Sequence, residues 1–116
     1  MKKKISLIIP AYSSDLSIED IIINILNWSL IPNEIIIINS SKKKYLIKLD
    51  LIKKLKKKKI KLITINSKNL FPGAARNIGV SRSNCEYIVF LDVNTLPYSK
   101  YWLEINYKYL VKKKLD

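Results

Sequence analysis

Four short apolar runs, separated by segments with helical spacing, constrain the fold of this 116-residue chain more than any other feature. The runs are rich in isoleucine and valine and cover residues 5–9, 34–38, 60–65 and 87–91. They show no alternation of polar and apolar residues, which indicates strands that are buried on both faces. Such strands are typical of parallel sheets that carry helices on each side.

The segments between and after these runs predict four helices, over residues 17–30, 46–55, 72–83 and 98–112, because apolar side chains recur there every three or four residues. Strand and helix therefore alternate four times. The expected fold class is α/β: a doubly wound, Rossmann-like and mainly parallel sheet, forming a single domain over residues 1–116. Right-handed crossovers favour the strand order 3-2-1 with the fourth strand on the other side of the first.

In such a sheet, ligands bind beyond the carboxyl ends of the strands, near the point where the strand order reverses. The polar or turn residues at these ends are Ala11-Tyr12, Asn39 and Asp92. Arg76 lies in the first turns of the helix that precedes the fourth strand. We therefore expect these residues to gather around one cleft.

The formal net charge of +13 comes mostly from lysine, because Arg76 and Arg82 are the only arginines among 22 basic residues. A solvated lysine surface is the favoured interpretation, and peripheral contact with an anionic membrane is the next. Nucleic-acid binding is less favoured, because it commonly uses arginine forks and stacked aromatic rings. No apolar run approaches the roughly 20 residues of a membrane span, and we expect a cytoplasmic protein, in contact at most with the inner face of the membrane.

Some kinds of chemistry are excluded by what the sequence lacks. The chain contains no histidine, so it has no Ser-His or Cys-His pair, and its single cysteine, Cys85, excludes an internal disulfide. The first strand is not followed by Gly-x-Gly-x-x-Gly, and the chain contains no Gly-x-x-x-x-Gly-Lys-Ser/Thr loop. A nucleotide would have to be bound by side chains instead.

Three stretches together resemble the glycosyltransferases of family 2, which have the GT-A fold. They are SLIIPAYS, PNEIIIINSS and FPGAARNIGVSRSNCEYIVFLDVNTLP, the last with the family's Gly-x-Ala-Arg-Asn-x-Gly segment and an Asp-x-Asp-like strand end. The resemblance covers about residues 5–103. It implies a nucleoside-diphosphate-sugar donor and a divalent metal ion, Mn²⁺ or Mg²⁺.

The resemblance assigns the nucleobase to the first two strand ends. Pro10, Ala11 and Tyr12 would line the base pocket, where Tyr12 offers a ring face. Asn39 replaces the aspartate with which the family reads a pyrimidine. An amide can still hydrogen-bond to uracil, but without the charge of a carboxylate.

The resemblance assigns the rest of the donor to the third segment. Arg76 would contact the base or the diphosphate, and Asp92 the ribose or, through water, the metal ion. Gly73, Asn77 and Gly79 of the same segment are expected to serve turns and packing.

The metal site departs from the family pattern. Asn94 stands where the family has the second aspartate of Asp-x-Asp, so Asp92 and Asn94 would be the metal ligands. Mg²⁺ and Mn²⁺ favour anionic oxygen ligands, so this replacement should weaken metal binding.

The family takes its general base and most acceptor contacts from residues beyond the Asp-x-Asp, and we identify no general base in this chain. The chain is therefore expected to be the donor half, or a truncated form, of an enzyme of cell-surface polysaccharide biosynthesis. Its expected acceptor is an unknown glycan or lipid-linked molecule. Two alternatives stay open: a nucleotide-binding or interaction module without turnover, and a basic domain for membrane or nucleic acid. An open sheet edge would also favour self-association.

Overall fold

A computed structural model describes residues 4–11, 18–40, 47–67, 72–92, 97 and 99–115 of the chain. Strands and helices alternate throughout, as the sequence predicts. The strands are β1 (Ile5–Ala11), β2 (Glu34–Asn39), β3 (Lys61–Asn66) and β4 (Tyr87–Phe90), and the helices are α1 (Ile18–Leu26), α2 (Leu49–Lys57), α3 (Pro72–Arg82) and α4 (Trp102–Leu115).

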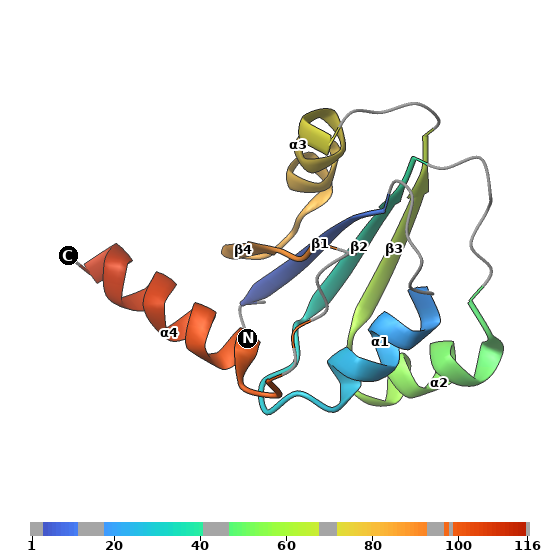
Figure 1. The fold of residues 1–116 in the computed structure, drawn as a ribbon, viewed down its shortest axis with the longest axis horizontal. Coiled ribbons are helices and arrows are strands. Elements are labelled where there is room, and N and C mark those ends of the chain that lie inside the picture. The colour runs from blue at the N-terminus through green and yellow to red at the C-terminus, as the bar shows by residue number, and fades with distance from the viewer. Residues whose placement is uncertain are drawn as a thin grey trace.

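The four strands form one parallel sheet in the order β3-β2-β1-β4, which confirms the predicted topology (Figure 1). The register aligns Ala11 of β1 with Asn39 of β2, and Asn39 with Asn66 of β3. On the other side of β1, Ile8 is aligned with Phe90 of β4. Three strands therefore end at the same level, and β4 ends three residues short of it, because Phe90 is aligned with Ile8 and not with Ala11.

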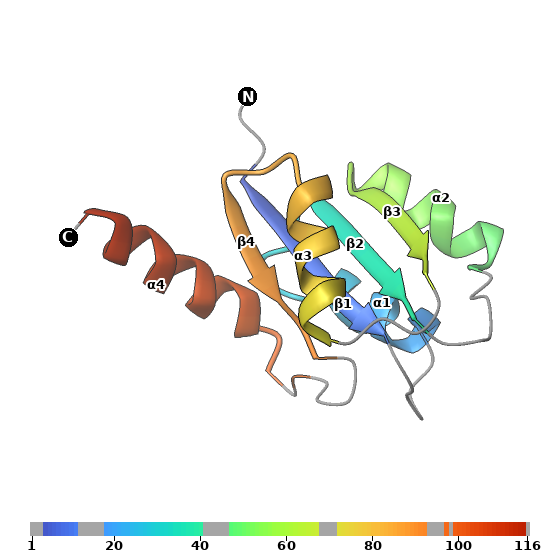
Figure 2. The ribbon, with the colours of Figure 1, turned by 90° about the horizontal axis from the view of Figure 1, so that it is seen from above.

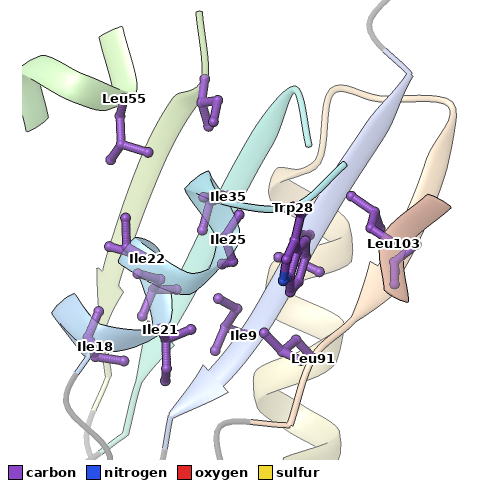
Figure 3. Packing of buried hydrophobic residues seen from close by; sticks show 14 of the residues in the cluster. Ile9, Ile18, Ile21, Ile22, Ile25, Trp28, Ile35, Leu55, Leu91 and Leu103 are labelled. Atoms are coloured by element: carbon purple, nitrogen blue, oxygen red, sulfur yellow. The ribbon is translucent and has the colours of Figure 1, made fainter. Parts of the chain in front are cut away.

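Helices α1, α2 and α4 contribute to the core on one face of the sheet (Figure 3). Ile21 and Ile25 of α1 and Leu55 of α2 are buried against alternate residues of the central strands. Trp28, just after α1, lies 5.4 Å from the ring of Trp102 at the start of α4. This aromatic contact joins the first and last helices across most of the chain length.

Helix α3 packs on the opposite face, across β1 and β2 (Figure 2). Ala75 is buried there, and a Cβ atom at Gly79 would lie only 2.5 Å from Cγ2 of Ile8 and 3.1 Å from Cδ1 of Ile38. The packing role predicted for Gly79 is therefore confirmed: the missing side chain lets the helix approach the sheet closely. At Gly73, by contrast, an added Cβ would meet nothing within 4 Å.

The predicted helices differ in detail from the observed ones, and α4 begins at Trp102 rather than at residue 98. Helix α1 ends at Leu26 rather than at residue 30, because the chain turns at Asn27 and buries Trp28, whose Nε1 donates to Oδ1 of Asn24 at 2.9 Å. In α2 the buried residues are Leu51 and Leu55, whereas the sequence predicted a face with apolar residues three apart, Leu46, Leu49, Ile52 and Leu55. Leu49 is 64% exposed. A face built on i, i+4 contacts replaces the predicted i, i+3 face.

Candidate functional site

The carboxyl ends of β1, β2 and β3 present a row of aligned residues, and its polar members are Asn39 and Asn66. Nδ2 of Asn39 donates to Oδ1 of Asn66 at 3.0 Å. Asn39 is buried, with 1% of its surface exposed, whereas Asn66 is exposed. The pair thus joins the ends of two neighbouring strands and presents one amide at the surface.

Asn66 was missed when the sequence was analysed. It follows the apolar run of the third strand directly, as Asn39 follows the second, so the same rule that selected Asn39 would have found it. Its pairing with Asn39 depends on the register between β2 and β3, and the sequence of a single strand does not determine that register.

The second group of candidate residues lies where β4 ends. Arg76 of α3 is exposed, and its guanidinium carbon lies 5.8 Å from the centre of the Phe90 ring, within the range of a cation–π contact. Phe90 is the last residue of β4, and the exposed Asp92 follows two residues later. The structure therefore brings Arg76 to the strand end that carries Asp92, and Phe90 is the residue that orients it there.

These two groups share one edge of the sheet but belong to different faces. Side chains alternate along β2, and Ile36 and Ile38 face α3, so the side chain of Asn39 lies on the α1 face. Phe90 is aligned with Ile8, which packs under α3, so Phe90 lies on the α3 face. Pro10 is half-buried and Ala11 is buried at the end of β1, which separates the two groups. Tyr12 and Asn94 lie outside the described residues.

The donor set for a metal ion is small in the described part of this edge. Asp92 is a carboxylate that closely follows a strand there, and no group of three or more histidine, cysteine or acidic residues is found among the described residues. Hard divalent cations prefer several oxygen ligands. Asp92 fits an ion that takes its other oxygens from a diphosphate and from water.

A buried carboxylate lies at the opposite, amino edge of the sheet, where sequence analysis expected nothing. Glu34 accepts hydrogen bonds from Oγ of Ser6 at 2.8 Å and from the backbone N–H and side-chain amide of Asn84, both at 3.0 Å. Ser83 donates in turn to the Ser6 hydroxyl at 2.7 Å. These bonds connect the start of β4 to the two central strands.

Burial alone would raise the pKa of Glu34, since it disfavours the charged form. The side-chain and backbone hydrogen bonds from Asn84, the Ser6 hydroxyl and the positive charge of Lys61 act in the other direction. Their combined effect is larger, so the pKa of Glu34 lies below its ordinary value of 4.5. Glu34 is therefore an ionised structural residue at neutral pH, and it lies far from the carboxyl edge.

A four-stranded parallel sheet in the order β3-β2-β1-β4, with helices on both faces, is a doubly wound α/β arrangement in which ligands bind at the carboxyl edge. The family comparison agrees with this class. The model of glycosyl transferase family 2 matches residues 6–116, and the chain belongs to that family. The predicted family and fold class are thus confirmed.

Solved structures show the same fold. S. aureus TarS 1–349 matches with a TM-score of 0.66 and 20% identity, over 94% of this chain and 32% of TarS. TarS 1–349 in complex with UDP-GlcNAc and in complex with UDP each match with a TM-score of 0.65 and 20% identity. The chain thus spans about a third of the length of these structures, covering 31% and 32% of the two complexes.

A comparison with curated proteins gave no match. Across the described residues, the helices are too short or too polar to cross a membrane.

Proposed function

We propose that the chain binds a nucleoside-diphosphate sugar at the carboxyl edge of its sheet and serves as the donor-binding part of a family 2 glycosyltransferase. One observation carries the proposal: the register that aligns Ala11, Asn39 and Asn66, with Asp92 following β4 at the same edge. The fold match to TarS in complex with UDP-GlcNAc supports it.

The amide pair is the proposed reader of the nucleobase, next to Pro10, Ala11 and Tyr12. Oδ1 of Asn66 accepts from buried Asn39, so the amide NH₂ group of exposed Asn66 is the one to donate to a ligand. A pyrimidine carbonyl oxygen accepts such a bond. Asn39 then acts on the base through Asn66, which it holds in place.

The proposed diphosphate and ribose contacts are Arg76 and Asp92. A guanidinium group donates two parallel hydrogen bonds to phosphate oxygens, and the cation–π contact with Phe90 restricts where Arg76 can point. Asp92 would accept from a ribose hydroxyl and, with Asn94, bind a metal ion that stabilises the leaving diphosphate. We assign no general base to this chain. The proposed acceptor is a glycan or lipid-linked molecule of the cell surface.

Replacement of Arg76 tests this proposal most directly. We expect UDP and UDP-GlcNAc, with Mn²⁺, to raise the melting temperature of the chain, and Arg76→Gln to weaken binding about 10-fold or more, because a charge-assisted bidentate contact is lost. Isothermal titration calorimetry gives the dissociation constants. Arg82→Gln is the matched control, because Arg82 is exposed on the same helix, and its affinity should change less than about 3-fold.

No melting-temperature shift at millimolar nucleotide would contradict the proposal, and so would equal losses in the two arginine variants. A second candidate function, a binding module without turnover, is favoured by the neutral Asn39 at the base-reading position. Nucleotide-sugar binding without sugar transfer or donor hydrolysis would identify it.

Asn94→Asp restores the second carboxylate of Asp-x-Asp and tests the proposed metal site. We expect Mn²⁺ to bind about 10-fold more tightly in the presence of UDP, because the ion gains an anionic oxygen ligand. Asp92→Asn should have the opposite effect. Titration of Mn²⁺ followed by electron paramagnetic resonance measures both, and an unchanged affinity in Asn94→Asp would remove Asn94 from the site.

A further inference from the structure

A groove of about 420 Å³ opens between α1 and α2, away from the proposed nucleotide site. Its lining residues come from the last turns of both helices and the residues that follow them. They are Ile23, Leu26, Asn27, Lys54, Lys57 and Lys58. We call this feature the α1–α2 groove.

One wall of the α1–α2 groove consists of the three lysines, all of which are exposed. Among the described residues an ion pair joins Lys108 to Glu104 on α4, but none involves a groove lysine. The charges of the three groove lysines are therefore not neutralised by an acidic side chain. The acid on α2, Asp50, lies in its first turn, at the other end of the helix. The groove therefore presents three uncompensated positive charges.

The other wall consists of Ile23, Leu26 and the polar Asn27. Ile23 is 47% exposed although it lies on a helix whose neighbouring isoleucines are fully buried, and Leu26 is half-buried beside it. Helix α2 separates the two kinds of side chain, because Leu51 and Leu55 point into the core while its lysines are exposed. Exposed lysines beside exposed aliphatic side chains can bind an anionic membrane surface, because the charges meet the headgroups while the aliphatic groups contact the region below them.

We propose that the α1–α2 groove docks the chain onto an anionic phospholipid membrane. The lysines would lie at the phosphate level of the headgroups, and Ile23 and Leu26 would contact the glycerol and upper acyl region. Charge complementarity selects an anionic surface. The aliphatic wall, without arginine or an aromatic ring, favours phospholipid over nucleic acid, which is commonly bound by those residues.

This surface is separate from the carboxyl edge. Helix α1 leads into the start of β2 and α2 into the start of β3, so the groove lies near the amino edge of the sheet. A six-residue strand separates the two edges by about 20 Å. Membrane docking and nucleotide binding can therefore be tested independently, and the proposal goes beyond the function proposed above.

The test is flotation of the full chain with vesicles of phosphatidylcholine, with and without 30 mol% phosphatidylglycerol, at about 0.1 M salt. We expect binding only with phosphatidylglycerol. The triple variant Lys54→Gln, Lys57→Gln, Lys58→Gln should bind about 100-fold more weakly, since each lysine near an anionic surface contributes about 1 kcal/mol. Ile23→Ser should bind about 5- to 10-fold more weakly.

The matched control is Lys108→Gln, Lys112→Gln, Lys113→Gln, which removes the same three charges from α4 and should lose less than about 5-fold. Each variant should keep the wild-type melting temperature and nucleotide response, because the replaced lysines are exposed. Equal losses in the two triple variants would overturn the proposal, as would absence of vesicle binding. Unchanged binding of Ile23→Ser, or lysine-dependent binding of an acidic peptide or of RNA in place of vesicles, would also overturn it.

Discussion

Replacement of Gly79 by alanine is expected to destabilise the chain by about 2 kcal/mol, although alanine gains about 1 kcal/mol of helix propensity over glycine. The new Cβ would lie 2.5 Å from Cγ2 of Ile8, a buried β-branched residue of the central strand. Carbon atoms in ordinary contact lie about 3.5–4.0 Å apart, so α3 or β1 must move. Denaturant unfolding followed by circular dichroism measures the loss.

Gly73→Ala is the matched control, since it makes the same change in the same helix where nothing lies within 4 Å. We expect it to be neutral or to stabilise the chain by up to about 1 kcal/mol. If both variants have the same stability, the close approach of α3 to the sheet is not a constraint on the fold.

Glu34→Gln is expected to cost about 2–3 kcal/mol at neutral pH, because the charged hydrogen bonds from Ser6 and Asn84 are lost or weakened. Glutamine has nearly the same shape, but its NH₂ group would oppose the Asn84 amide, which is also a donor. The same unfolding measurement applies. Glu104→Gln is the control, because it changes an acid on the surface that forms an i, i+4 pair, and it should cost about 0.5 kcal/mol or less.

The same carboxylate predicts a pH dependence. The pKa of Glu34 is lower in the folded chain than the ordinary value of 4.5, so its stabilisation is fully present above about pH 4.5 and is lost as the pH falls through the folded-state pKa. We expect the difference between wild type and Glu34→Gln to shrink on acidification from pH 6 to pH 3. A difference that stays constant over this range would show that the carboxylate charge does not stabilise the fold.

Most of the fold could be predicted from local patterns. The four apolar runs indicated strands covered on both faces, and the structure confirms their positions and their order. The central strands β1 and β2 are buried almost throughout, whereas the edge strand β3 has no buried residue. The apolar residues of the segment predicted as the last helix also pack as their spacing indicates: Leu103 lies in the main core, and Trp102, Tyr107 and Leu110 pack against it. Local patterns succeed here because a buried parallel sheet leaves few ways to arrange such elements.

The polar interactions were harder to predict, because they join residues far apart in the chain. The contact of Glu34 with Asn84 spans 50 residues, and Asn39 meets Asn66 only because β2 and β3 are in register. The contact of Arg76 with Phe90 depends on how closely α3 packs, which Gly79 sets. None of these three contacts can be predicted from the residues that neighbour each partner in the sequence.

The positions of the site residues could be predicted only in part, because a rule that selects strand ends gives the edge of the sheet but not its face. The structure places the described residues at one edge, with Asn39 and Arg76 on different faces of the sheet.

The strand β2 has a further consequence for the behaviour of the protein in solution. Its run of four isoleucines, residues 35–38, is fully buried between β1 and β3. A short uncharged segment of this kind readily forms intermolecular cross-β structure when it is exposed. Solubility therefore depends on keeping the sheet closed, and partial unfolding should lead to aggregation rather than to a soluble intermediate.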